Sequence, residues 1–281
     1  MRLLSTSAIL VAALCPASAL AQSDIAPEES VFDGDYLTVG VGAIYGPSYD
    51  GSDDYVLSPV PVLQGNLKGI EITPRPGGIA LDVVPDGENP KLGFSFGPVA
   101  SISRNRASQI EDSVVRAAGK LDTAFELGVN GGITAYKLLH EYDSLTVSAD
   151  IKWDVAGAHS GRVISPSITY FTPLSRAALI TLSVSAKHVD DDYARYYYGV
   201  SLAQSVASGL PEFQAKSGWD SVGIGILAGY DLNGNALDGG FAVFALGSYS
   251  RQLNDAKRTP YTSLRGDADQ WIGGAGIGFT F

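Results

Sequence analysis

The chain has few of the residues and segments that several classes of protein require. Its 281 residues include one cysteine (Cys15), one methionine and three histidines. Only 17% of the residues are charged, and the formal net charge is −11 at pH 7, which is the wrong sign for binding nucleic acid through its phosphates. Beyond the N-terminal segment, no apolar run approaches the ~20 residues that a transmembrane helix needs.

The first 21 residues are typical of a secretory signal peptide. Arg2 supplies the positive start, residues 8–14 form a short apolar run, and residues 19–21 give the small-x-small cleavage pattern. We expect cleavage after Ala21, since the bulky Leu14 does not fit the lipoprotein signal that Cys15 would otherwise suggest. The mature chain would then contain no cysteine, which excludes disulfides, thiol catalysis and cysteine-ligated metals.

The chain is rich in glycine (33) and tyrosine (14), and its C-terminal residues 271–281 alternate with a period of two. Apolar and aromatic residues occupy one face, and mostly small or polar residues occupy the other, which fits a strand between lipid and a lumen. Because an open sheet edge cannot stay unpaired in hydrocarbon, this strand would close a barrel against the first strand. Its end, with Phe279 and Phe281, resembles the terminal signal by which bacterial outer-membrane barrels are recognised for insertion.

Similar alternation predicts strands along most of the chain after a polar periplasmic lead at 22–35. The regular runs are 36–45, 55–64, 92–102, 125–135, 145–155, 164–170, 178–187, 222–230, 239–251 and 271–281. We interpret 70–83 as one strand interrupted by a bulge and count 196–201 as a further strand. The prediction is an all-β, transmembrane antiparallel barrel of about twelve strands over residues 36–281, with both ends in the periplasm; ten is the alternative if those two segments are not full strands.

Two segments fit this pattern poorly. Residues 104–120 break the alternation and permit either a short helix or a mobile loop, and the count of twelve puts them at the end where short turns are expected. Pro59 and Pro61 cannot donate to a sheet ladder, so we expect an edge or a bulge in that strand. A soluble β-sandwich would also alternate, but it explains less well why the inward faces are rich in glycine, serine and aspartate.

The histidines offer little catalytic chemistry. His140 and His159 lie in predicted turns without an evident partner, and His188 stands beside the acidic run 190–192 as the one credible candidate. A solvated acidic loop is the favoured interpretation of that run. We therefore predict no catalytic residue and no enzyme activity.

The acidic and basic side chains offer two further kinds of site, cation ligands and pore-lining groups. Asp50, Asp53 and Asp54 could bind a hard cation such as Ca²⁺, but their spacing is not that of an EF-hand, so a hydrated loop is favoured and no metal or cofactor is predicted. Five charged residues should face the lumen, as a salt-bridged plug rather than a selectivity ring. They are Glu126, Asp150, Lys152, Asp154 and Lys187.

Three motifs are spread over most of the chain. They are Tyr49-x-Gly51-Ser52-Asp53 with Pro59-x-Pro61; Tyr197-Tyr198-Gly199-Val200-Ser201 with Ser208-Gly209-Leu210-Pro211; and Tyr249-x-Arg251-x-Leu253-x-Asp255 with Pro260. In these motifs the chain resembles the MltA-interacting protein (MipA) and OmpV family of outer-membrane proteins. Thr259 departs from the serine that is usual in the family, although it keeps the hydroxyl.

The resemblance implies a barrel in the outer membrane of a Gram-negative bacterium, in contact with its lipid. For one branch it also implies a scaffold that brings a murein lytic transglycosylase together with a murein synthase, whereas other members resemble surface antigens or adhesins. We therefore expect a non-enzymatic scaffold or interaction protein of the cell envelope. The competing hypotheses are a narrow porin-like channel for small solutes and a surface adhesin.

Overall fold

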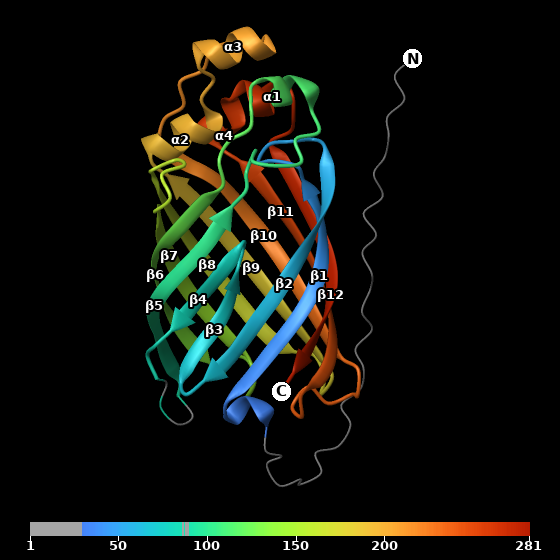
Figure 1. Cartoon of the computed structure of the whole chain (residues 1–281). Helices are drawn as coiled ribbons and strands as arrows, with labels where there is room; N and C mark the ends of the chain where they lie inside the picture. The colour runs from blue at the N-terminus through green and yellow to red at the C-terminus, as the bar shows by residue number, and fades with distance from the viewer. Residues whose placement is uncertain (1–29, 86, 88–89) are drawn as a thin grey trace.

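The computed structural model describes residues 30–85, 87 and 90–281, and its strands form a closed antiparallel barrel (Figure 1). The predicted signal peptide and residues 22–29 of the predicted lead lie outside the described residues. The strands are β1 (Tyr36–Pro47), β2 (Tyr55–Leu67), β3 (Ile70–Arg75), β4 (Gly78–Asp82), β5 (Leu92–Ser103), β6 (Ala124–Tyr136), β7 (Ser144–Asp154), β8 (Arg162–Pro173), β9 (Ala178–Val189), β10 (Gly218–Asp231), β11 (Gly240–Gln252) and β12 (Asp269–Thr280). Within the described part of the chain, no helix has the length and apolarity to cross a membrane.

The barrel closes where the sequence predicted, between the first and last strands. β1 and β12 pair from Thr38↔Thr280 to Tyr45↔Gly273, and the backbone N–H of Phe281 donates to the carbonyl of Leu37 over 2.9 Å. Every strand otherwise pairs with its neighbours in the sequence. The ladder therefore has no free first or last strand, as a barrel in hydrocarbon requires.

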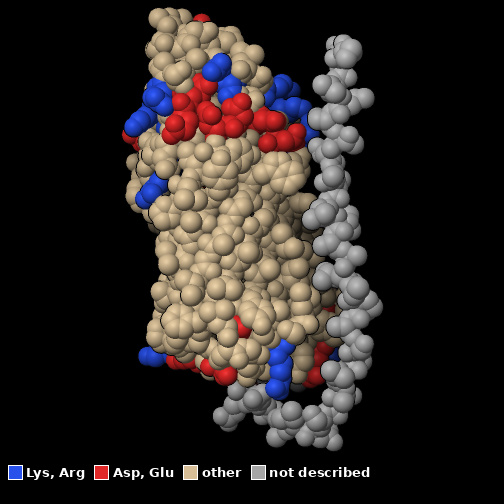
Figure 2. All heavy atoms as spheres, turned by 90° about the vertical axis from the view of Figure 1, so that its right-hand side faces the viewer, with Lys and Arg blue, Asp and Glu red and all other residues tan. Residues whose placement is uncertain are grey.

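The outer wall is apolar over most of its height. Outward-facing side chains near the middle of the strands are highly exposed, including Val41 (59%), Val184 (54%) and Ile224 (60%). Lys, Arg, Asp and Glu gather in two bands near the ends of the molecule, and the zone between them carries few charges (Figure 2). This arrangement is the one expected of a wall in contact with lipid.

The prediction of twelve strands is confirmed, but two of the predicted strands, 70–83 and 196–201, were wrong. Residues 70–83 are not one bulged strand. They form the two short strands β3 and β4, paired from Glu71↔Asp82 to Arg75↔Gly78. Gly77 has a φ of +69°, which suits a tight hairpin turn and which other residues rarely adopt. Residues 196–201 are not a strand, since they contain the end of helix α2 (Asp191–Tyr198).

The two prolines of β2 lie along a stretch that is paired on one side only. Pro59 and Pro61 face Ala43 and Val41 of β1, whereas β3 pairs with β2 only at Gly65–Leu67. A proline nitrogen cannot donate to β1, so it must point away from that strand, toward the unpaired edge. The prolines thus remove two donors from a part of the wall where the ladder is incomplete.

The two ends of the barrel differ in their connections. Both described termini and the short turns lie at one end, with the 3-10 helix η1 (Val31–Asp33), whose Val31 N–H donates to the Leu237 carbonyl over 2.8 Å (Figure 1). Longer loops lie at the other end and carry α1 (Ser113–Ala117), α2, α3 (Leu202–Ser208), α4 (Asn254–Arg258) and α5 (Pro260–Ser263). Short turns are periplasmic and long loops extracellular in such barrels. The expectation that 104–120 is at the short-turn end was therefore wrong, because the β3–β4 hairpin reverses the direction of β5–β9 relative to our count. Since 196–201 is not a strand, β10–β12 run in the predicted direction again.

Candidate functional site

The long loops pack into a layer over one mouth of the barrel, which we call the cap. It consists of residues 48–54, 104–123, 155–161, 190–217 and 253–268. Two apolar clusters hold the cap together, one around α2, which includes Val163 and Val189 of the barrel strands, and one around α1. The first contains Val163, Val189, Tyr193, Ala194, Tyr197, Tyr198, Ala215 and Ala256, and the second contains Tyr49, Ile110, Val115, Ala118, Val200, Leu210 and Tyr261.

Helix α2 supplies the tyrosines of the first cluster. It begins at an acidic N-cap, Asp190, whose carboxylate accepts from the Tyr193 N–H over 3.0 Å. Tyr193 and Tyr197 are one helical turn apart with ring centroids at 4.5 Å, and both are buried with Tyr198. Burial raises the pKa of all three phenols, so these side chains remain neutral even in alkaline solution.

The first sequence motif joins the loop 48–54 to the last strand. Gly51 has a φ of +97°, and a Cβ there would lie 2.2 Å from the hydroxyl oxygen of Thr262. Its N–H donates to Gln270 of β12 over 3.2 Å, and its carbonyl accepts from the Asp267 N–H over 3.0 Å. Ser52 is fully buried, whereas Asp53 is exposed. Glycine is therefore required at position 51 by both backbone conformation and space.

The second and third motifs meet each other in the cap. The Thr259 hydroxyl donates to the Tyr198 carbonyl over 2.7 Å, and the Tyr198 hydroxyl donates to buried Asp220. A Cβ on Gly199 would lie 2.3 Å from the Arg195 carbonyl oxygen. Asp255 accepts from the Lys216 N–H over 2.8 Å. The replacement of serine by threonine at 259 thus retains a hydrogen bond between the two motifs.

The remaining motif positions have separate places. Gly209 ends α3 with a φ of +76°, directly after Ser208, whose hydroxyl donates to the Gln204 carbonyl over 2.6 Å. Pro260 is buried at the start of α5, and Pro211 is exposed. Arg251 faces outward and forms an ion pair with Asp269 at 3.0 Å. The structure thus brings most motif positions into or beside the cap, but it leaves Pro59 and Pro61 on the outer wall.

Sequence reasoning missed the residue that joins the two apolar clusters of the cap. Arg106 is 1% exposed, and its guanidinium carbon lies 3.7 Å from the ring centroid of Tyr261. The guanidinium donates to the Tyr197 carbonyl over 3.2 Å and to the Gly119 carbonyl over 3.4 Å. Burial lowers the pKa of Arg106, and the neighbouring tyrosines counteract that effect. No local pattern in 104–120 distinguishes this arginine from the exposed ones.

Ion pairs line the lumen below the cap. The Lys152 Nζ lies 2.6 Å from a carboxylate oxygen of Glu126. The Lys187 Nζ lies 3.3 Å from a carboxylate oxygen of Asp220 and 3.4 Å from one of Asp50. The Lys187 ammonium also donates to the Tyr193 hydroxyl over 2.7 Å, which connects the barrel wall to the cap.

Two of the predicted luminal acids have other partners. The Asp150 carboxylate pairs with the Arg75 guanidinium of β3 at 3.0 Å, and sequence reasoning had placed Arg75 in the bulge of a single strand at 70–83. Asp154 instead accepts from the N–H groups of Ala156 and Ser160 and so shapes the turn above it.

The histidines and the loop aspartates do not assemble into a reactive site. The His188 ring contacts the Trp219 ring edge-on, with the ring centroids 5.3 Å apart, while the Asp190 carboxylate caps the N-terminus of α2. His159 is fully buried with its Nε2 3.4 Å from Glu126, and His140 bonds to Thr172 over 2.6 Å. Among residues 30–85, 87 and 90–281, no group of three or more His, Cys, Asp or Glu side chains could hold a metal ion.

Comparison with known proteins agrees with the motifs. The family model described as MltA-interacting protein MipA matches residues 39–281, and no curated protein matches the chain significantly. Similar solved structures include the COG4313 outer membrane channel from Pseudomonas putida F1, with 11% identity, a TM-score of 0.47, and coverage of 92% of this chain and 100% of that one. Another is the outer membrane protein OprD from Pseudomonas aeruginosa, with 12% identity, a TM-score of 0.37, and coverage of 90% and 66%. This outer-membrane β-barrel therefore belongs to the MltA-interacting protein MipA family.

Proposed function

We propose that the protein is a non-enzymatic scaffold, with its barrel fixed in the outer membrane and its periplasmic turns in contact with a murein lytic transglycosylase. A murein synthase would be the second partner of the same assembly. The observation that carries this proposal is an exposed apolar surface on two turns at the periplasmic end. The name of the family supports it, since it refers to interaction with MltA.

The periplasmic turns expose large apolar side chains to the surroundings. Leu139 is 82% exposed and Tyr142 67% exposed in the turn 137–143, and Leu174 is 64% exposed in the turn 174–177. The two turns adjoin, because the His140 Nε2 lies 2.6 Å from the Thr172 hydroxyl at the end of β8. Apolar groups gathered on an exposed surface commonly mark an interaction site.

This apolar surface is held in a fixed shape. Asp143 is 2% exposed, and its carboxylate accepts from the Leu138 N–H over 2.7 Å, from the Leu139 N–H over 2.9 Å and from the Tyr170 hydroxyl over 2.8 Å. Such a turn loses little conformational entropy when it binds, which favours association. The surface thus suits a protein partner that approaches from the periplasm.

The opposite mouth favours a scaffold over a channel. Arg106 and the cap tyrosines form a packed apolar layer over that mouth, and Lys187 pairs with Asp220 beneath it. A porin-like lumen would instead need a water-filled path lined by charged rings. Conductance of the purified protein in planar bilayers tests this point, and an open pore would favour the channel hypothesis.

The scaffold is tested with matched substitutions at the two ends. Leu139→Asp combined with Leu174→Asp should reduce co-purification of the lytic transglycosylase from detergent-solubilised envelopes. Leu202→Asp on α3 is the control, because Leu202 is also 64% exposed but lies on the cap. All variants must first show heat-modifiable migration, which reports a folded barrel. Equal recovery of the enzyme with the periplasmic double variant and with the control would refute the proposed contact.

The tip of the cap favours a surface adhesin as a second candidate. Helix α3 exposes Leu202 (64%) and Val206 (79%) at the far end of the cap, and residues 199–211 carry no charge (Figure 1). Val206→Asp should then lower adhesion of intact cells to host surfaces without affecting recovery of the murein enzyme. Unchanged adhesion would remove this candidate.

A further inference from the structure

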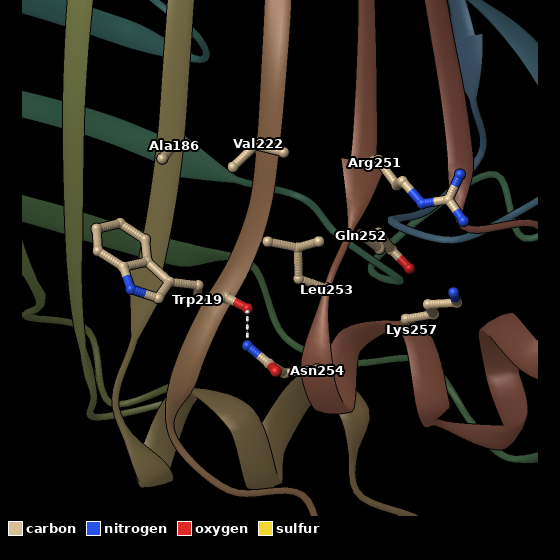
Figure 3. Close-up of a pocket in the computed structure, with 8 residues that line it drawn as sticks. All are labelled: Ala186, Trp219, Val222, Arg251, Gln252, Leu253, Asn254 and Lys257. Atoms are coloured by element: carbon tan, nitrogen blue, oxygen red, sulfur yellow. Dashed lines mark hydrogen bonds between the residues drawn. The ribbon is translucent and has the colours of Figure 1, made fainter.

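An apolar groove opens on the outer wall of the barrel beside α4 (Figure 3). Its volume is about 610 Å³. Three strands and the start of the loop after β11 supply its lining, which consists of Ala186, Trp219, Val222, Arg251, Gln252, Leu253, Asn254 and Lys257. None of these residues contributes to the ion pairs of the lumen or to the periplasmic turns described above.

The groove faces the surroundings of the barrel rather than its lumen. Ala186 and Arg251 are the register partners of Val222 on either side, and all three belong to the outward-facing set of their strands. Trp219 is 45% exposed and Val222 is 44% exposed. Trp219 also stacks against His188 at 5.3 Å, and its carbonyl accepts from the Asn254 amide over 2.9 Å. The apolar lining is therefore preformed and open to lipid.

Two cations lie at the same side of this lining (Figure 3). The Arg251 guanidinium forms an ion pair with Asp269, in which its Nη1 donates to the two carboxylate oxygens over 3.0 and 3.2 Å. Lys257 is exposed, and the ion pairs among the described residues do not include it. Arg251, Lys257 and Asp269 together leave a net positive charge at the edge of an apolar surface. A complementary ligand has an acyl chain and an anionic headgroup.

The position of the groove identifies the source of such a ligand. It lies where the lipid-facing strands meet the cap, which is the extracellular end of the barrel. The outer leaflet of a Gram-negative outer membrane consists largely of lipopolysaccharide, whose phosphorylated glucosamines carry acyl chains. We propose that the groove binds lipopolysaccharide, with an acyl chain against Trp219 and Val222 and a glucosamine phosphate at Lys257 and Arg251. Phosphate and ammonium groups form strong charge-assisted hydrogen bonds at such a boundary.

The proposal is tested by native mass spectrometry of the full-length folded barrel in detergent. Lipid A and phosphatidylglycerol are added separately at equal concentration, and the fraction of protein that retains one lipid is measured. Lys257→Glu should weaken lipid A retention roughly tenfold, since it removes one charged hydrogen bond and adds repulsion. Ala186→Phe should also reduce retention, because its ring would fill the groove while the outer wall stays apolar.

The control is Lys120→Glu, which makes the same change of charge on an exposed cap lysine that precedes β6. It should retain lipid A as the natural protein does. Equal retention by the natural protein, Lys257→Glu and Ala186→Phe would overturn the site, and so would an equal loss in Lys120→Glu, which would indicate non-specific attraction. Retention of phosphatidylglycerol as strong as that of lipid A would overturn the assignment to lipopolysaccharide.

Discussion

Replacing Arg106 by alanine should open the cap while leaving the barrel folded. Its side chain lies between the cap's two apolar clusters, with contacts to Tyr261 and to the Tyr197 carbonyl. No barrel strand depends on it, since the strands are held by their own ladders. The effect should therefore be confined to the free energy of local opening of the cap.

The magnitude follows from the contacts that are lost. A desolvated cation–π contact contributes about 2 kcal/mol, and hydrogen bonds from a charged donor contribute roughly 1.5–3 kcal/mol each before the cost of burying the charge. Alanine would also leave the carbonyls of Tyr197 and Gly119 without this donor and create a void. A net loss of about 3 kcal/mol raises the open fraction on the order of a hundredfold.

Limited trypsin digestion of intact cells measures this opening, because proteolysis follows the population of the open state when closing is fast. Cleavage in the loop 104–123 should become much faster in Arg106→Ala, and heat-modifiable migration should remain. Arg104→Ala is the matched control, since Arg104 is exposed only two residues away. Equal protease resistance of Arg106→Ala and Arg104→Ala would refute the proposed role of Arg106 in joining the cap.

Three further predictions concern the wall, the cap and the C-terminus. Val184→Arg on the lipid face should cost about 2–4 kcal/mol in barrel unfolding, whereas Ser185→Arg, which is exposed toward the lumen, should cost much less; similar losses in urea titrations would mean that the faces are misassigned. Burial tends to raise the pKa of Asp112, but hydrogen bonds from Arg265 and from the Val115 and Val114 N–H groups lower it below its usual value. The Asp112 carboxylate therefore stabilises the cap at pH values above its unfolded pKa, and this stabilisation is lost as the pH falls through the lower folded pKa. Acidification should therefore increase the pepsin sensitivity of Asp112→Asn less than that of the natural chain. Deleting Phe281 should lower the fraction of inserted protein while Phe281→Tyr stays near normal, and full insertion of the deletion variant would argue against an insertion signal at Phe279 and Phe281.

The barrel could be predicted from the sequence because alternation reports directly which side chains face lipid. β1, β7 and β12 follow residue patterns of period two along most of their length. The β3–β4 hairpin was missed because its strands are only 6 and 5 residues long, too short for the alternation to distinguish a hairpin from a bulge. We counted this hairpin as one strand and the helical segment 196–201 as another, and these two opposite errors left the total number of strands correct.

The cap was harder to predict because its elements are determined by tertiary burial. Tyr196–Tyr198 has strong strand propensity, yet the N-cap at Asp190 and the burial of Tyr193 and Tyr197 on one side make the segment helical. The Asp190–Asp192 run was interpreted as a solvated loop, although an acidic N-cap before a helix was the available signal. The contacts of Arg106 join segments about 90 and 155 residues away in the sequence and leave no local pattern.

The direction of the barrel in the membrane is the claim on which the scaffold, the cap and the lipid groove all depend. The only cysteine, Cys15, belongs to the predicted signal peptide, so single cysteines can be introduced at Ser205 on α3 and at Leu139 in the periplasmic turn. A membrane-impermeant maleimide should label Ser205→Cys in intact cells, and it should label Leu139→Cys only after the outer membrane is permeabilised. Labelling of Leu139→Cys but not of Ser205→Cys in intact cells would contradict the account.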